Sequence, residues 1–206
     1  MGLPNQLTVL RMILTPFIVA FIFINSSFTL QIALGLFLAA AITDWYDGRY
    51  ARKYGYISKW GKFLDPLADK ILVSSSLATF YVLSYIKLWV VMVIVIRDFI
   101  ITGLRLFALH NNKSINTNNI AKVKTFIQMS LVFIILIYMN LERSINSNIS
   151  KYTIANIITF EDLINKAALF VAFLTAFTGA FYIVENRSHV KDIIWRFYRV
   201  FVPSDL

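Results

Sequence analysis

The sequence predicts an all-α integral membrane protein with six transmembrane helices and both termini on the cytoplasmic side. Of its 206 residues, 58% are hydrophobic and only 15% are charged, and the mean hydropathy is +0.68. Soluble domains are typically about 45–50% apolar and about 25% charged. The apolar residues form six runs at roughly 7–24, 28–43, 63–86, 88–109, 123–141 and 163–184. A helix needs about 20 residues to cross a hydrocarbon core of about 30 Å, and most of these runs are long enough.

Charged residues interrupt the middle runs. The second run is short unless it continues through 44–48, which would place two aspartates at its end. The third run contains two more aspartates and Pro66, so its helix is expected to start or kink at that proline. The fourth run carries the adjacent pair Arg97 and Asp98 deep within it. The segment 141–162 is expected to be an outer loop with some local helix.

The orientation follows from the distribution of Lys and Arg, which are enriched in cytoplasmic loops. With six spans, one side holds 49–62, 105–124 and the tail after 185, which together carry thirteen basic residues. The other side carries four, namely Lys87, Arg143, Lys151 and Lys166. Both termini and the aspartate-rich segment are therefore expected in the cytoplasm.

We expect residues 1–206 to form a single membrane-embedded catalytic domain, since no polar linker divides the chain. The tail at 187–203 alternates basic with aromatic or aliphatic residues and suits an amphipathic helix in the membrane interface. A frayed polar tail is the alternative. The net charge of +9 lies in short segments between apolar runs, where anionic membrane lipids explain it better than nucleic acid does. The chain has no cysteine, which excludes disulfides and thiolate metal sites.

Four aspartates lie within 26 residues where the second and third runs meet. They are Asp44, Asp47, Asp65 and Asp69. Residues three or four apart share a helix face, so the first two lie on one stripe and the last two on another. Gly48 and Gly61 remove side chains where helices or a ligand approach closely.

Four carboxylates converging in a partly desolvated site do not all remain ionised unaided. Two divalent cations would cancel their charge, and oxygen ligands suit Mg²⁺ or Mn²⁺ rather than zinc. Such a two-metal site is typical of enzymes that transfer phosphoryl groups. The alternative is a set of helix caps and surface salt bridges with neighbouring basic residues, among them Lys62 and Lys70.

The spacing D-x2-D-G-x2-A-R-x8-G-x3-D-x3-D, from residue 44 to residue 69, resembles the signature of the CDP-alcohol phosphotransferases. All eight fixed positions are present, and the six-helix layout agrees with that family's fold. The resemblance implies that a CDP-linked lipid is cleaved, its phosphatidyl group is transferred to an alcohol, and CMP is released. It implies that the four aspartates ligate two metal ions and that Asp69 is also the general base. It further implies that the cytidine diphosphate is bound by Gly48, Ala51 and Arg52, with Gly61 close by.

Three further stretches resemble the phosphatidylglycerophosphate synthase branch of that family. LPNQLTVLRMILTP at 3–16 resembles the opening of that branch, and its Asn5, Thr8 and Arg11 share one helix face. We expect these three near the nucleotide. GKFLDPLADK at 61–70 and RDFIITGLR at 97–105 are also typical, although the branch more often has Glu in place of Asp98. Asp98 and Arg105 are seven residues apart and therefore share a helix face. Arg97 and Asp98, as charges within a membrane span, are candidates for a functional role, and a buried ion pair that fixes helix packing is an equal alternative.

Arg105, Lys122 and Lys124 are candidate ligands of a small anion at the cytoplasmic end of the fourth and fifth runs. Ordinary positive-inside charges are the alternative. If they bind an anion, the acceptor carries a phosphate, and glycerol 3-phosphate fits. The predicted reaction is therefore transfer from CDP-diacylglycerol to glycerol 3-phosphate. Other acceptors remain open, namely phosphatidylglycerol in a cardiolipin synthase or inositol phosphate, and so does a small ion transporter.

The resemblance also suggests a homodimer. It favours a bacterial inner membrane with the active site facing the cytoplasm.

Overall fold

The computed structural model describes residues 3–54, 59–110, 119–145, 151–185 and 187. Within these ranges it describes the side chains of residues 6–44, 46, 64–108, 123–144, 161–185 and 187. The tail at 187–203 is outside the described residues apart from residue 187.

The described chain is entirely helical outside short connections. Its helices are α1 (Leu3–Ile24), α2 (Ser27–Tyr54), α3 (Lys59–Val82), α4 (Leu88–His110), α5 (Asn119–Ile145) and α6 (Lys151–Glu185). Each predicted run lies within one helix, except that the third run extends beyond the end of α3. Helices are expected here because a long apolar stretch in a membrane must satisfy its backbone hydrogen bonds internally.

Two details differ from the prediction. The third helix does not start at Pro66, because α3 begins at Lys59 and contains that proline in its interior. The expected outer loop at 141–162 is largely helical, since α5 continues to Ile145 and α6 begins at Lys151. The polar residues that suggested a loop instead extend both helices beyond their apolar segments.

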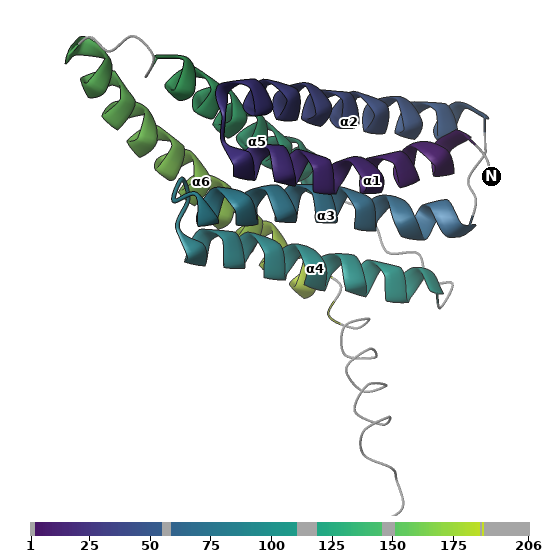
Figure 1. Cartoon of the computed structure of the whole chain (residues 1–206). Helices are drawn as coiled ribbons and strands as arrows, with labels where there is room; N and C mark the ends of the chain where they lie inside the picture. Colours follow the sequence, from purple (N-terminus) through teal and green to yellow (C-terminus); the bar gives the residue numbers. More distant parts are fainter. Residues whose placement is uncertain (1–2, 55–58, 111–118, 146–150, 186, 188–206) are drawn as a thin grey trace, which may run out of the picture.

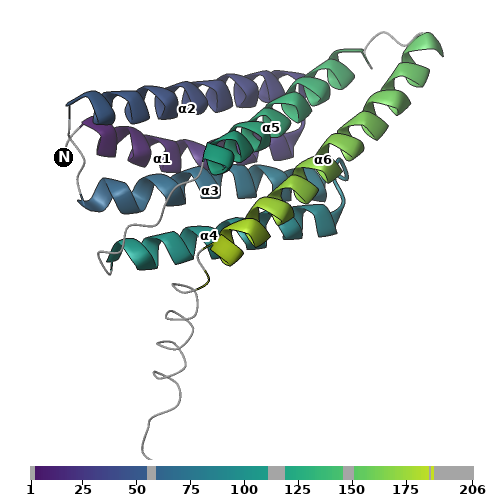
Figure 2. The same cartoon turned by 180° about the vertical axis from the view of Figure 1, so that it is seen from behind.

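Four helices lie side by side in one layer, in the order α2, α1, α3 and α4 (Figure 1). Helices α5 and α6 cross one face of this layer (Figure 2). Helix α5 packs on α2 and α3, and α6 packs on α4 and α5. The start of α1, the end of α2, the start of α3 and the end of α4 therefore lie at the same end of the layer (Figure 1).

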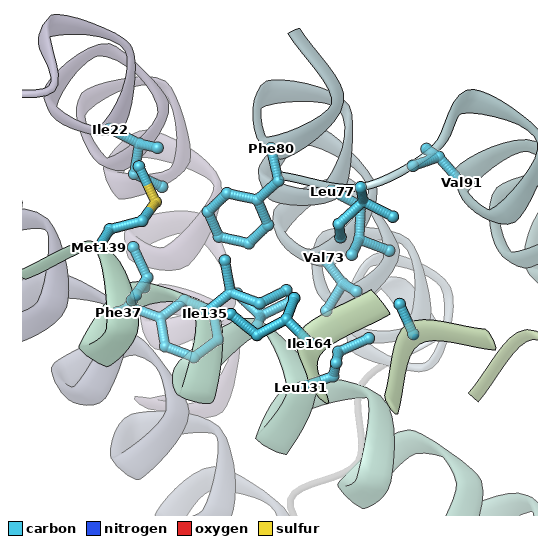
Figure 3. Packing of buried hydrophobic residues seen from close by; sticks show 14 of the residues in the cluster. Ile22, Phe37, Val73, Leu77, Phe80, Val91, Leu131, Ile135, Met139 and Ile164 are labelled. Carbon is cyan, nitrogen blue, oxygen red and sulfur yellow. The ribbon is translucent and has the colours of Figure 1, made fainter. Parts of the chain in front are cut away.

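The core lies between the layer and the two crossing helices (Figure 3). Phe80 of α3 and Phe37 of α2 are at most 1% exposed and pack with Ile135 of α5. Large apolar side chains on the outer faces are exposed, as Phe173 of α6 is at 72%. Because lipid tails are as apolar as these side chains, such an outer surface suits a membrane protein.

Four of the described helices are long and apolar enough to cross a membrane, namely α1, α2, α5 and α6. Helices α3 and α4 carry charged residues within their apolar segments, among them Asp65, Asp69, Arg97 and Asp98. The sequence prediction of an all-helical membrane protein is thus confirmed, with six helices and four apolar candidate spans.

A hydrogen bond connects α5 with the turn that joins α3 and α4. This turn lies at the end of the layer opposite the aspartates. The Tyr85 hydroxyl donates to Glu142 Oε2 at 2.6 Å. Hydrogen bonds to charged groups contribute about 1.5–3 kcal/mol. We expect Tyr85→Phe to lower the free energy of unfolding by about that amount, measured by denaturation in detergent. Tyr81→Phe, the same change at a side chain that is 40% exposed, should have a much smaller effect. Equal losses would contradict this role for the bond.

Candidate active site

The eight positions of the aspartate signature lie on two helices that end and begin at the same end of the layer. Asp44, Asp47, Gly48, Ala51 and Arg52 lie on the last turns of α2, and Gly61, Asp65 and Asp69 lie on the first turns of α3. The described side chains among them are Asp44, Asp65 and Asp69. The other five positions are placed by their backbone alone.

Helix α1 lies between α2 and α3 and contacts an aspartate from each. The Thr8 hydroxyl donates a hydrogen bond to Asp65 Oδ1. Arg11 Nη1 lies 2.6 Å from Asp44 Oδ1. Thr8 and Arg11 are 0% and 1% exposed, so both polar side chains are directed into the protein. The spacing of three residues gives them one helix face, as the sequence predicted.

Asp44 lies within electrostatic range of both Asp65 and Asp69, although these residues belong to a different helix. Arg11 is the cation that compensates Asp44. The structure therefore brings the two predicted stripes together around the buried face of α1.

Only one of the two carboxylate oxygens of Asp69 has a partner among the described residues. Its Oδ1 atom is buried and has no hydrogen-bond partner among the described residues. Its Oδ2 atom lies 3.4 Å from Lys70 Nζ. A buried polar atom without a partner is costly unless another group, such as a substrate or an ion, completes its bonding.

The donor set suits hard divalent cations. Among the described side chains, which do not include that of Asp47, no three His, Cys, Asp or Glu residues are arranged to hold a metal ion. Asp44, Asp65 and Asp69 nevertheless offer carboxylate oxygens, and Asp69 Oδ1 is without a protein partner. Carboxylate oxygens are the ligands that Mg²⁺ and Mn²⁺ prefer.

A second group of charged residues lies beside the aspartates, around Asp98 of α4. Its carboxylate is 1% exposed and contacts three basic side chains. Lys124 Nζ of α5 donates to Oδ1, Arg97 Nη1 lies 3.1 Å from Oδ1, and Lys70 Nζ lies 3.5 Å from Oδ2. The sequence indicated that Arg97 and Asp98 have a functional or a packing role but did not predict that Lys70 and Lys124 are their partners.

Two of the three predicted acceptor ligands, Lys124 and Arg105, have described side chains, and each has a different partner. Lys124 is 1% exposed and pairs with Asp98. Arg105 lies two turns further along α4, about 10 Å at 1.5 Å per residue, where it interacts with Tyr182 of α6. The side chains of Lys122 and of Asn5 lie outside the described part of the chain.

Sequence reasoning missed Lys70 as a component of the site. It treated Lys70 only as a surface salt-bridge partner, whereas the side chain is 12% exposed and lies between Asp69 and Asp98. Its position directly after the last signature aspartate was the available signal. Thr178 was also missed, and it accepts a hydrogen bond from Arg97 Nη2 at 3.0 Å.

The bond from Thr8 to Asp65 gives a first test of this arrangement. Thr8→Val removes the hydroxyl without changing the shape of the side chain much, and leaves Asp65 without a donor from α1. We expect activity to fall about tenfold, as for the loss of a hydrogen bond to a charged group, while Thr8→Ser retains it. Thr15→Val is the matched control, because the Thr15 hydroxyl donates to the Arg11 carbonyl one turn earlier, at 2.8 Å, and to no carboxylate among the described residues. Equal losses in the two Val variants would contradict a specific role for Thr8.

Comparisons with known proteins agree with the family resemblance of the aspartate signature. The profile of the CDP-alcohol phosphatidyltransferase family matches residues 1–161. A Rickettsia bellii protein named CDP-diacylglycerol–glycerol-3-phosphate 3-phosphatidyltransferase is 35% identical over 182 residues, which cover 88% of this chain and 93% of the relative. A Rickettsia felis protein of the same name is 33% identical over the same shares. A Bacillus subtilis protein of that name is 43% identical over 103 residues, covering 50% of this chain and 53% of the relative. The chain therefore belongs to the CDP-alcohol phosphatidyltransferase family.

Proposed function

We propose that the protein transfers the phosphatidyl group of CDP-diacylglycerol to glycerol 3-phosphate, giving phosphatidylglycerophosphate and CMP. The observation that carries this function is that the buried face of α1 contacts Asp44 of α2 through Arg11 and Asp65 of α3 through Thr8, with Asp69 one turn further along α3. Family membership supports the reaction type. The shared name of relatives that align over most of this chain supports the acceptor.

In this proposal Asp69 accepts the proton of the acceptor hydroxyl. The hydroxyl oxygen forms a bond to the phosphorus that carries the diacylglycerol, and the bond from that phosphorus to the CMP oxygen breaks. CMP leaves with the electron pair of that bond. A carboxylate within reach of a hydroxyl performs such proton transfer, and the unpartnered Oδ1 of Asp69 is the available acceptor.

Thr8 and Arg11 orient the other two carboxylates, Asp65 and Asp44. We propose that Asp44, Asp47, Asp65 and Asp69 hold two Mg²⁺ or Mn²⁺ ions. Such ions would neutralise the carboxylates, polarise the pyrophosphate and stabilise the departing CMP. The cytidine diphosphate is assigned to the end of α2 and the facing turns of α1 and α3. The residues are Asn5, Thr8, Arg11, Gly48, Ala51, Arg52 and Gly61.

We further propose that all six helices lie in the membrane, with both termini and the aspartate end in the cytoplasm of a bacterial cell. The excess of Lys and Arg in the segments on that side supports this orientation. Placing α3 and α4 in the membrane explains why their charged residues are buried and paired within the protein. A homodimer in the inner membrane is part of the same proposal.

An acceptor panel tests the function. The purified protein is supplied with CDP-diacylglycerol, a divalent cation, and in turn glycerol 3-phosphate, inositol phosphate, serine or phosphatidylglycerol, and CMP is measured. We expect release with glycerol 3-phosphate to exceed release with each other acceptor. Preference for phosphatidylglycerol or inositol phosphate would assign the chain to another reaction of the family, and no release with any acceptor would contradict the proposal.

A further inference from the structure

The charged group around Asp98 has an excess of positive charge in a buried environment. Lys70, Arg97 and Lys124 come from three different helices and all contact this one carboxylate. Their side chains are 12%, 15% and 1% exposed. Charges so far from water are costly unless they are paired, and here three cations contact only two carboxylates in the described part of the chain, Asp98 and, through Lys70, Asp69.

Helix α6 fixes one of the three cations. Arg97 Nη2 donates to Thr178, and the Arg97 side chain passes over Gly179. A Cβ atom at position 179 would lie 2.8 Å from Arg97 Cγ and 2.9 Å from Nε, so the close approach requires glycine there. The Arg97 side chain is thus part of the contact between α4 and α6. Lys70 and Lys124 belong to the other two helices, α3 and α5, and contact Asp98 from there.

A continuous series of contacts connects these lysines with the catalytic end of the molecule. Asp69 contacts Lys70, Lys70 contacts Asp98, and Asp98 contacts Lys124. Each step is at most 3.5 Å. The cations therefore lie next to the carboxylate assigned as the general base, on the side away from Asp44 and Arg11.

We propose that Asp98 is a positioning residue for the acceptor, holding Lys70 and Lys124 so that their ammonium groups bind the acceptor's phosphate. This inference rests on the proposed function. The three cations exceed the two carboxylates that they contact, Asp98 and Asp69, by one positive charge. A phosphate monoester carries a charge of about −1.5 to −2 at pH 7 and so compensates this surplus. Binding of the phosphate compensates the surplus and places the acceptor hydroxyl beside Asp69. Lys70 joins Lys124 as an acceptor ligand, and Asp98 acts through both without touching the substrate.

Asp98→Asn tests the inference, because it removes the charge and retains the shape of the side chain. The KM for glycerol 3-phosphate should rise about ten- to hundredfold, the loss expected when charge-assisted contacts are no longer held in place. The KM for CDP-diacylglycerol should change less than about twofold, since the nucleotide is assigned to the other side of Asp69. Asp98→Glu, which restores the carboxylate, should recover most of the affinity for glycerol 3-phosphate.

Asp162→Asn is the matched control, because Asp162 pairs with Lys166 at 2.7 Å on an exposed part of α6 and both kinetic constants should stay unchanged. A purely structural ion pair would shift both KM values together or neither, and either result with folded Asp98→Asn would overturn the inference.

Lys70→Met provides a test that leaves Asp98 paired with Lys124 and Arg97 and so preserves the fold. It should also raise the KM for glycerol 3-phosphate selectively, and an unchanged value would overturn the inference. Wild-type CMP release with glycerol 3-phosphate, measured in the same series, reports separately on the proposed function.

Discussion

Asp69→Asn is expected to lower the turnover number by about 10²–10⁴-fold while binding of the CDP-linked lipid is partly retained. The carboxamide cannot accept a proton, yet it has nearly the same shape as the carboxylate. Oδ1 of Asp69 is buried without a partner among the described residues, so the atom is available to the acceptor hydroxyl. Single-turnover CMP release and equilibrium binding of CDP-diacylglycerol measure the two quantities separately.

Asp162→Asn serves as the control for that experiment. Its carboxylate is 66% exposed and its pair with Lys166 lies at the surface, where such pairs contribute at most about 1 kcal/mol. Turnover should therefore match the wild type. Loss of lipid binding in Asp69→Asn without a selective loss of chemistry would remove the general-base assignment.

Chelation of divalent cations is expected to abolish CMP release, and addition of Mg²⁺ or Mn²⁺ is expected to restore it. The reason is that Asp44 lies within electrostatic range of Asp65 and Asp69, and like charges in a partly desolvated site are unfavourable unless a cation neutralises them. A ligand that binds only the folded state stabilises it by about 2.7 kcal/mol at one hundred times its Kd. The melting temperature in detergent should therefore rise with the concentration of the metal.

Asp65→Asn should reduce this metal-dependent rise in melting temperature, whereas Asp162→Asn should leave it unchanged. The melting measurement does not depend on substrate turnover, so it separates metal binding from catalysis. Full activity in excess chelator, or a melting temperature that does not respond to either metal, would contradict the two-metal proposal.

The sequence predicted the positions of the helices because apolar runs long enough to cross a membrane have few alternatives to a helix. It also predicted that Thr8 and Arg11 share a face and that the two pairs of aspartates lie on two stripes. These are properties of a single helix, and helical spacing determines them. The prediction offered a start or a kink of the third helix at Pro66, and the start was wrong, since the first turns of α3 precede that residue.

Partners from different helices could not be predicted from spacing. Asp98 and Arg105 share a face of α4, but the contacts of Asp98 are with Lys70 of α3 and Lys124 of α5. The contact with Lys70 depends on how α3 and α4 pack within the layer, and the contact with Lys124 depends on how α5 crosses it (Figure 2). For the same reason Lys70 was considered a surface residue, although its side chain is only 12% exposed.

The most direct test of the central claim is to measure both products in one reaction. Purified protein in liposomes is given CDP-diacylglycerol and glycerol 3-phosphate, and CMP and phosphatidylglycerophosphate are measured by mass spectrometry. The account predicts that the two products form in equal amounts with the wild type and that both fall together in Asp69→Asn. CMP formed without phosphatidylglycerophosphate, or equal product formation by wild type and Asp69→Asn, would contradict it.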